Sequence, residues 1–295
     1  MLSAPTRSNT VAVVVTFLPD ESNSLFAATR EITGRLIVID NSEDAKTTDM
    51  LGSAANELDF ELITNTKNIG VAAALNQGAQ LALEKRAEWL LALDQDSQPL
   101  PAILEILDRA FEAAQCDERI GVIGSTSAVD VSKNAARKFR EVISVITAGS
   151  LINLKAWTAS GGFREDFFID GVDEEYSLRL RRHGYRVIQA TEIGIHHLVG
   201  EPSRHRLFGR EMMVTNHSPS RRYYMTRNRI RLAIEYFCAQ PKWISDYFLY
   251  SVKDLIRSLL FERQRLKKFC AVLLGIRDAL FGRMGPLRNR WLADR

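Results

Sequence analysis

The chain has 295 residues, of which 46% are hydrophobic and 25% are charged, as in a globular protein with a full-sized core. Its three cysteines lie far apart and form no paired spacing, which argues against a disulfide framework or a structural zinc site and fits a reducing compartment. No apolar segment approaches the roughly 18 residues of a membrane span. The short apolar run after Arg7 has no cleavage pattern, so we predict a first strand rather than a signal peptide.

The net charge of +3 is unevenly distributed. Residues 241–295 contain 12 Lys and Arg against 5 Asp and Glu, a local charge of +7, which leaves −4 for residues 1–240. A basic tail on an acidic-leaning body indicates that the tail has a partner.

Short apolar runs alternate with helical stretches through the first half of the chain. We predict buried strands at residues 11–17, 36–39, 60–63, 89–93 and 120–124, and a helix at residues 68–83. This order is typical of a parallel α/β sheet covered by helices on both faces. Ligands bind such sheets beyond the carboxyl ends of the strands. Polar residues gather at these ends, namely Thr16, Asp40, Asn41, Ser42, Asn65, Asp94, Gln95 and Asp96.

From residue 143 the pattern changes. A helix is expected from Asp173 to His183, closed by Gly184, and a strand at residues 185–188. Beyond about Val199 the sequence is basic, aromatic and helical, and we expect no further strands there.

Asp94 and Asp96 end the apolar run at residues 89–93. On a strand their side chains would point to the same side, and Pro99 and Pro101 would stop any further ladder pairing. Two like charges on one side repel each other unless solvent or a cation lies between them. The pair is either a polar turn that caps the next segment, or a site for a hard divalent cation that carries phosphate oxygens. Its alignment with the other polar strand ends favours the second interpretation.

Residues 167–185 allow two interpretations that do not exclude each other. Asp173 is placed to cap a helix whose first turn carries Glu174 and Glu175. With Asp170, however, these make four carboxylates in six residues, more than a cap needs. A partly desolvated carboxylate on a loop rim can take a proton from an attacking alcohol.

Two further groups stay open. His196 and His197 are adjacent, so on a strand at most one of them can join the aspartates at a metal, and a structural pair is the alternative. Residues 217–237 carry five arginines, interleaved with Tyr223 and Tyr224. They fit a solvated helix face, a nucleic-acid surface or an arginine clamp on a diphosphate, and charge alone does not separate these.

Six stretches, taken in order, resemble the inverting family 2 glycosyltransferases of the GT-A fold, and within them the bacterial rhamnosyltransferases that build O-antigen and related cell-surface polysaccharides. The stretches are Thr16–Pro19, Val38–Ser42, Asn68–Gly78, Leu93–Ser97, Gly161–Asp173 and Tyr223–Asn228, and the resemblance covers residues 11–237. The chain departs from the family at Phe17 and Leu18, where relatives commonly have Tyr-Asn. It departs again at Gly171 and Val172, where many have an acidic residue immediately before the base.

The resemblance implies a GT-A domain over residues 1–200, which binds a nucleotide-sugar and carries out catalysis, and a helical region over residues 201–295 on the acceptor or membrane side. Asp173 matches the family's catalytic base. Asp96 and His196 match ligands of a divalent cation, Mg²⁺ or Mn²⁺. By the same match, the donor would be bound by Thr16, Pro19, Asp40, Asn41, Asn68, Gly70, Asn76, Asp94 and Arg227.

The resemblance also implies the transfer of L-rhamnose from dTDP-L-rhamnose to a lipid-linked oligosaccharide, in the cytoplasm or on the cytoplasmic face of the inner membrane. In the C-terminal region, apolar residues recur at helical spacing among Lys253, Arg257, Arg263, Arg265, Lys267 and Lys268. We expect this region to attach to anionic lipid. A packed helical subdomain or a homo-oligomer would use the same pattern.

Other functions stay open as alternatives. They include a catalytically inactive scaffold subunit of a polysaccharide assembly complex and a glycosyltransferase for a different nucleotide-sugar. The presence of Asp94, Asp96 and Asp173 argues against loss of catalysis. The acidic body argues against a nucleic-acid binder, and a nucleotidyltransferase would usually need a glycine-rich phosphate loop near the N-terminus, which is absent.

Overall fold

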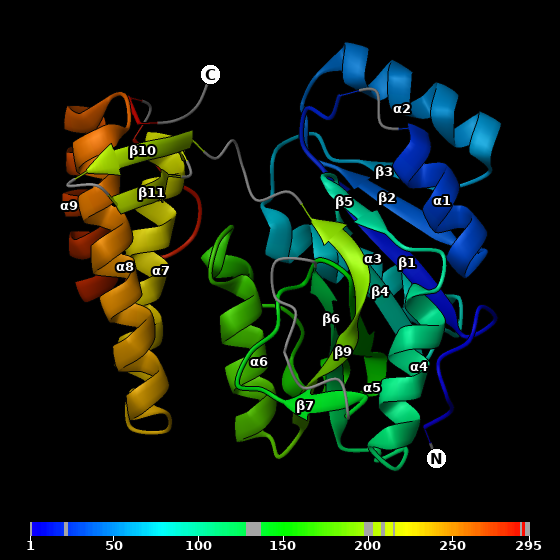
Figure 1. The fold of residues 1–295 in the computed structure, drawn as a ribbon. Helices are drawn as coiled ribbons and strands as arrows, with labels where there is room; N and C mark the ends of the chain where they lie inside the picture. The colour runs from blue at the N-terminus through cyan, green and yellow to red at the C-terminus, as the bar shows by residue number, and fades with distance from the viewer. Residues whose placement is uncertain are drawn as a thin grey trace. The chain divides into compact units, whose positions relative to one another are not determined.

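The computed structural model describes residues 2–20, 23–127, 137–197, 203–207, 210–214, 216–289 and 291–292. The chain forms two compact units (Figure 1). A sheet unit comprises Met1–Arg164 and Asp173–His197, and a helical unit comprises Glu165–Val172 and Leu198–Arg295. The short segment Glu165–Val172 therefore belongs to the helical unit, although sheet-unit residues precede and follow it in the chain.

The sheet unit is built on one mixed sheet in the order β3-β2-β1-β4-β8-β6-β9-β5, with β7 paired to β9. Neighbours among β1, β2, β3 and β4 run parallel, as do β6 and β9, whereas β8, β5 and β7 pair antiparallel. The predicted α/β fold is confirmed. The strands are β1 (Thr10–Thr16), β2 (Leu36–Asp40), β3 (Glu61–Thr64), β4 (Trp89–Asp94), β5 (Ser97–Pro99), β6 (Ile120–Ser127), β7 (Phe139–Glu141), β8 (Ser150–Asn153) and β9 (Arg186–His197).

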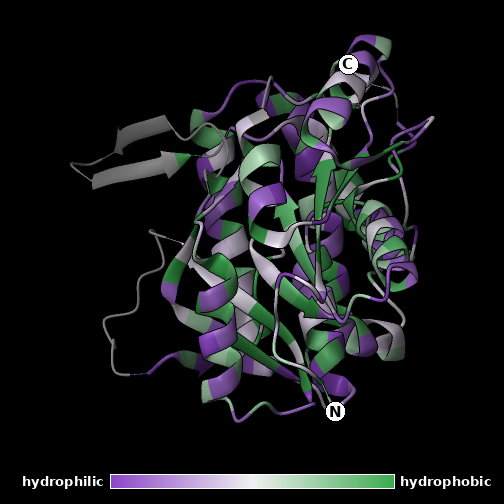
Figure 2. Cartoon of the chain, turned by 90° about the vertical axis from the view of Figure 1, so that its right-hand side faces the viewer, coloured by the Kyte–Doolittle hydropathy of each residue, from purple (hydrophilic) through white to green (hydrophobic). Residues whose placement is uncertain are grey.

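Helices cover both faces of this sheet. Side chains alternate along each buried strand, so the strand presents apolar residues to the helices on both faces. Ala12 and Val14 of β1 belong to a core cluster with residues of α1, α2 and α4. Val13 faces α3 so closely that a Cβ atom on Gly78 would lie 2.5 Å from it. The strands consist mainly of hydrophobic residues (Figure 2). The helices are α1 (Asn23–Thr33), α2 (Ala45–Leu58), α3 (Val71–Glu84), α4 (Ile103–Ala113), α5 (Leu154–Ser160) and α6 (Val172–Arg182), with a 3₁₀ turn at Glu165–Phe167.

The segment after β4 differs from its prediction. Strand β4 ends at Asp94 and residues 95–96 form a turn, so strand alternation does not orient Asp96. Pro99 does not prevent pairing: it ends β5, which pairs antiparallel with β9 at Ser97↔His197 and Pro99↔Ile195. Strand β5 is the last in the order of strands and therefore lies at an edge of the sheet, where proline is tolerated.

The helical unit consists of α7 (Pro219–Tyr236), α8 (Pro241–Phe261) and α9 (Arg265–Leu280) with a hairpin of β10 (Ser203–Leu207) and β11 (Arg210–Val214). The expectation of no further strands is therefore wrong. The C-terminal helical region itself is confirmed. Helices α7 and α9 pack closely, since a Cβ atom on Gly275 would lie 2.8 Å from the carbonyl oxygen of Tyr223. Among the helices of the described residues, none is long and apolar enough to cross a membrane.

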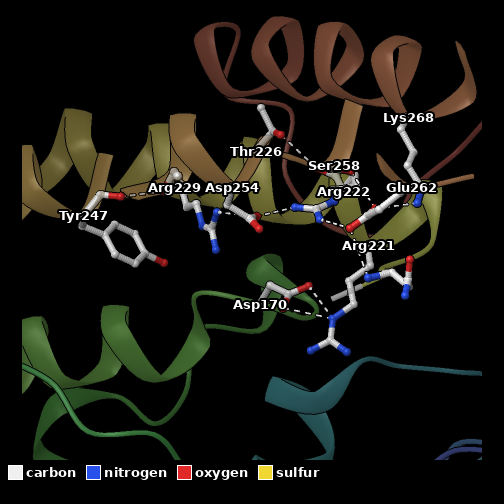
Figure 3. Close-up of polar contacts among 12 residues, drawn as sticks. Asp170, Arg221, Arg222, Thr226, Arg229, Tyr247, Asp254, Ser258, Glu262 and Lys268 are labelled. Atoms are coloured by element: carbon white, nitrogen blue, oxygen red, sulfur yellow. Dashed lines mark hydrogen bonds and ion pairs between the residues drawn. The ribbon is translucent and has the colours of Figure 1, made fainter. Parts of the chain in front are cut away.

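A buried ion-pair network joins the three helices of this unit (Figure 3). Arg222 of α7 pairs with Asp254 of α8 and, at 2.8 Å, with Glu262. Glu262 also accepts from Lys268 of α9 at 2.6 Å and from Ser258 at 2.7 Å. Within this network, the buried cations Arg222 and Lys268 are each paired with a buried carboxylate, which offsets the cost of removing their charges from water.

Candidate active site

The parallel strands bring the predicted polar residues to one edge of the sheet. Thr16 lies opposite Asp40 in the β1–β2 register, and Asp94 lies opposite Val15 in the β1–β4 register. Asp40 is fully buried, and its Oδ1 accepts from the hydroxyls of Thr16 at 2.9 Å and Ser42 at 2.5 Å. Its Oδ2 has no hydrogen-bond partner among the described residues. A buried acceptor of this kind is costly unless a donor reaches it.

A layer of amides lies beside this edge. The Asn65 Nδ2 group donates to the side-chain oxygens of Asn41 and Gln77, both at 3.0 Å. The Asn68 side chain accepts from the N–H of Gly70 at 2.9 Å. Gly70 precedes α3 with φ of 85° and ψ of 163°, a conformation open essentially to glycine alone. Three of the residues predicted to bind the nucleotide-sugar, Asn41, Asn68 and Gly70, thus lie beside the start of α3.

The turn after β4 is fixed by Gln95, one of the polar residues at the strand ends, to which the sequence analysis assigned no role of its own. The side-chain amide of Gln95 accepts from the N–H of Phe17 at 2.7 Å and donates to its carbonyl at 3.2 Å. This pair joins the loop after β1 to the turn that carries Asp94 and Asp96. Asp94 is partly buried and Asp96 is exposed. Phe17 and Leu18 are exposed apolar residues at the same edge, and Pro19 is partly buried.

One predicted metal ligand, Asp96, lies in the turn between β4 and β5, and the other, His196, lies on β9. His196 of β9 is exposed and lies opposite Gln98 of β5, two residues after Asp96. Within the ranges that the structure describes, no group of three or more His, Cys, Asp or Glu side chains is arranged to hold a metal ion. The side chain of His197 lies outside the described residues.

Asp173 lies in the first turn of α6 and is partly exposed. Its Oδ1 accepts from the N–H of Glu174 at 3.2 Å. Burial raises the pKa of the Asp173 carboxyl well above its ordinary value, and the charges of Glu174 and Asp94 raise it further. Asp173 lines a small cavity with Thr147 and Ser150, and Ser150 lies opposite Ala92 of β4, two residues before Asp94.

Helix α6 is held to the turn after α5. Arg179 pairs with the buried Glu175 at 2.9 Å and donates to the carbonyl of Gly162 at 2.5 Å. The same turn is bound by α3, because Asn76 accepts from the N–H of Phe163 at 2.7 Å and donates to its carbonyl at 2.8 Å. Asn76 also accepts from Trp157 at 3.2 Å. The Asn76 amide therefore holds the turn that supports α6. The sequence analysis had predicted that Asn76 contacts the nucleotide-sugar.

The loop that leads into α6 belongs to the helical unit and is held by Asn228. The Asn228 Nδ2 group donates to the carbonyls of Phe167 and Ile169, both at 2.9 Å, and of Asp170 at 2.6 Å. Phe168 and Asp170 have φ of 67° and 61°, in the left-handed region that such residues rarely adopt. The amide thus stabilises a strained loop. Arg221 pairs with Asp170 at 3.2 Å (Figure 3).

Arg227 is fully buried beside Asn228. Its guanidinium donates to the Asn228 side chain at 2.9 Å and to the carbonyls of Phe167 and Gly285. The rings of Tyr223 and Tyr224 lie 5.3 Å and 5.1 Å from its carbon. The hydrogen bonds of the guanidinium are made within the helical unit. The sequence analysis had predicted that Arg227 contacts the nucleotide-sugar.

The fold is that of the GT-A glycosyltransferases. The model of the family described as glycosyl transferase family 2 matches residues 23–170, half of the chain, and the chain belongs to this family. The protein is therefore a glycosyltransferase.

Individual relatives agree with this assignment. The chain is 28% identical over 251 residues to dTDP-rhamnosyl transferase RfbF of Shigella flexneri, covering 77% of this chain and 80% of the relative. Its fold is similar to mannosyltransferase PcManGT of Pyrobaculum calidifontis, solved with GDP-Man and Mn²⁺ (TM-score 0.58, 13% identity, 93% of this chain and 87% of that one). It is also similar to residues 1–349 of TarS of S. aureus with UDP-GlcNAc (TM-score 0.55, 13% identity, 92% and 80%).

Proposed function

We propose that this enzyme transfers L-rhamnose from dTDP-L-rhamnose to a lipid-linked oligosaccharide, with inversion at the anomeric carbon. The similarity to dTDP-rhamnosyl transferase RfbF supports the donor. The observation that carries the mechanism is the position of Asp173, partly exposed in the first turn of α6, together with a pKa that burial raises. A carboxylate beside a donor site and with raised basicity is suited to take a proton from a hydroxyl.

The donor lies along the carboxyl ends of β1, β2 and β4 in this proposal. Thr16, Pro19, Asp40, Asn41, Asn68, Gly70 and Asp94 form its site. The buried Oδ2 of Asp40 is suited to accept from an N–H or O–H group of the nucleoside. The exposed ring of Phe17, whose backbone is fixed by Gln95, offers the thymine base a stacking surface.

Asp173 acts as the general base. It accepts the proton of an acceptor hydroxyl while that oxygen forms a bond to the anomeric carbon. The bond between this carbon and the diphosphate oxygen breaks on the opposite side, and dTDP leaves. One displacement of this kind inverts the configuration. Asn76 and Asn228 act through the backbone on either side of α6 and position Asp173 without contacting the sugar.

Asp96 and His196 would hold a divalent cation, Mg²⁺ or Mn²⁺. Mg²⁺ sites typically take one or two protein carboxylates and complete their shell with substrate phosphates and water, so Asp96 would leave positions for the diphosphate of the donor. The bound cation would neutralise charge on the diphosphate leaving group. The PcManGT structure contains Mn²⁺ with its nucleotide-sugar.

A donor screen tests this proposal. The chain is incubated with dTDP-L-rhamnose, UDP-GlcNAc or GDP-mannose, with Mn²⁺ or with EDTA, and thermal stability and donor hydrolysis are measured. We expect a metal-dependent rise in Tm with dTDP-L-rhamnose that exceeds the rise with the other two donors. A larger response to UDP-GlcNAc or GDP-mannose would assign a different donor sugar.

We also propose that α8 attaches the enzyme to anionic lipid on the cytoplasmic face of the inner membrane. Its exposed apolar side chains are Phe248, Leu249, Tyr250, Val252, Ile256 and Leu260. Lys253 and Arg257 lie on the same helix. Lys268 takes no part, because it is buried against Glu262. Sedimentation with anionic and neutral vesicles tests the attachment, and equal recovery in both supernatants would contradict it.

A further inference from the structure

A pocket lies in the helical unit, at the C-terminal end of α9. It has a volume of about 790 Å³, which is within the range of roughly 300–1,000 Å³ found for small-molecule sites. It is lined by the end of α9, by the segment that follows it as far as residue 289, and by Tyr223 of α7. No residue of the proposed active site lines it.

The lining is strongly basic. It contains Arg277, Arg283 and Arg288 against a single acid, Asp278, a formal charge of +2. Asp278 is fully engaged: its Oδ1 accepts from two nitrogens of Arg277 at 2.9 Å and 2.7 Å, and its Oδ2 accepts from Tyr223 at 2.9 Å. Within the described ranges, Arg283 and Arg288 have no carboxylate at ion-pair distance. Among the described residues, the pocket therefore has two cations without a carboxylate at ion-pair distance, beside a third that is paired with Asp278.

The segment that carries Arg283 and Arg288 is fixed at several points. The N–H of Arg283 donates to the carbonyl of Asp278 at 2.8 Å, and that of Leu287 donates to the Tyr224 hydroxyl at 2.6 Å. The N–H of Gly285 donates to the carbonyl of Asp166 at 2.7 Å, and its carbonyl accepts from Arg227. A pocket held in this way loses little freedom when it binds a ligand, so the arginines are preorganised.

Large apolar side chains adjoin the basic lining. Leu280 and Phe281, directly before the pocket residue Gly282, are 65% and 73% exposed. Leu273, Arg277 and Leu280 recur at helical spacing and share one face of α9. Exposed apolar groups next to a cluster of arginines match a ligand with an apolar part and an anionic head, and arginine binds phosphate by paired hydrogen bonds.

We propose that this pocket binds a phosphate group carried by an amphiphile, with the phosphate against Arg277, Arg283 and Arg288 and the apolar part against Leu280 and Phe281. The phosphate of a membrane lipid and that of a lipid-linked saccharide share this chemistry. The inference uses neither the donor site nor Asp173, and it concerns a different surface from the apolar face of α8. For a membrane lipid it goes beyond the proposed reaction, and for a lipid-linked saccharide it rests on the acceptor proposed above.

Binding of dihexanoyl phosphatidic acid, used below its micelle concentration, tests the proposal with the full chain. The double variant Arg283→Glu/Arg288→Glu is compared with Arg86→Glu/Lys155→Glu, which makes the same change of charge at exposed positions of the sheet unit, outside the pocket and outside both proposed binding surfaces. We expect the pocket variant to bind at least tenfold more weakly by calorimetry and the matched control to bind within twofold of the wild type. Equal losses in both variants, or no binding by the wild type, would overturn the proposal.

Two further arms identify the ligand. Inorganic phosphate alone is expected to bind at least tenfold more weakly than the phosphatidic acid, and Leu280→Ser/Phe281→Ser should weaken only the phosphatidic acid. Equal affinity for the two probes would overturn the assignment of an amphiphile. Sedimentation with vesicles that contain 30% phosphatidylglycerol distinguishes a membrane lipid from a lipid-linked saccharide as the source of the phosphate. Loss of sedimentation in the pocket variant assigns a membrane lipid. Unchanged sedimentation of a pocket variant that binds phosphatidic acid more weakly assigns the phosphate of a lipid-linked saccharide.

Discussion

Each unit of this enzyme holds a carboxylate that is partly removed from water. The pKa values of these two carboxylates are shifted in opposite directions. In the sheet unit, burial and the charges of Glu174 and Asp94 raise the pKa of Asp173 well above its ordinary value. In the helical unit, burial alone would raise the pKa of Glu262, but Lys268, Ser258 and Arg222 hold it below its ordinary value. The number of cations and donors around each group decides the difference, and it separates a group suited to proton transfer from one that holds helices together.

Replacing Asp173 by Asn should have the largest effect. The amide cannot accept the proton of the acceptor hydroxyl, so we expect transfer to fall by about 10³-fold while donor affinity stays within twofold. The variant should also have a higher Tm than the wild type at neutral pH, because an unfavourable buried charge is removed. Asp96→Ala is the matched control, and it should instead weaken donor binding that depends on metal. A normal transfer rate in Asp173→Asn would show that Asp173 is not the base.

The same test in the helical unit is Arg222→Met. This change leaves Glu262 and Asp254 buried with fewer cations, and we expect a loss of about 3 kcal/mol of unfolding free energy, since breaking a buried ion pair is strongly destabilising. Arg263→Met at an exposed position should change it by less than about 0.5 kcal/mol. Denaturant unfolding followed by circular dichroism measures both. Similar losses in the two variants would contradict a structural role for the buried network.

Much of the sheet unit could be predicted from the sequence, because buried strands leave a local signal. The apolar runs at 11–17, 36–39 and 89–93 correspond to β1, β2 and β4, and the polar residues at their ends do meet at one edge. The hairpin of β10 and β11 was missed because Ser203–Leu207 is too basic to show an apolar alternation. Strand β5 was missed because its pairing depends on β9, almost a hundred residues later.

The side-chain roles were less predictable where the partners are distant in the chain. Arg222 is bound by carboxylates 32 and 40 residues away, and Asn228 binds carbonyls about 60 residues before it. No local pattern distinguishes these residues from a solvated or phosphate-binding arginine face. Gln95 carried a weak signal, since it lies between two aspartates at a strand end and its partner Phe17 ends another predicted strand.

Asn228→Ala tests how the helical unit supports the base. It removes three hydrogen bonds to carbonyls of the loop before α6, so we expect a loss of about 2 kcal/mol in unfolding free energy. Because this loop leads directly to Asp173, kcat should fall about tenfold with the KM for donor unchanged. Asn65→Ala, in the amide layer of the sheet unit, should raise the donor KM with kcat unchanged. An unchanged kcat in folded Asn228→Ala would separate the loop from the position of the base.

The pH dependence of the two units should be opposite, and it provides the finest test of the comparison. Above about pH 4, where an unfolded aspartate ionises, folded Asp173 still retains its proton because its pKa is raised. The folded state then binds more protons than the unfolded state, so the contribution of Asp173 to stability is present at low pH and is lost as pH rises through the folded pKa. Glu262 has a lowered pKa, so its contribution is present above its unfolded pKa and is lost as pH falls.

Transfer activity should follow Asp173 in the reverse sense to stability, because only the ionised carboxyl can accept a proton. We expect kcat/KM to rise about tenfold per pH unit below the folded pKa and then to level off. Thermal unfolding of the wild type, Asp173→Asn and Arg222→Met across the same pH range assigns each pH dependence of stability to its residue. The loss of stability toward high pH should vanish in Asp173→Asn. The loss of stability toward low pH should change in Arg222→Met, because Glu262 then lacks one of its cations. If kcat/KM were flat over this range while the stability slope of Asp173 persisted, the raised pKa would belong to a buried acid that takes no part in proton transfer.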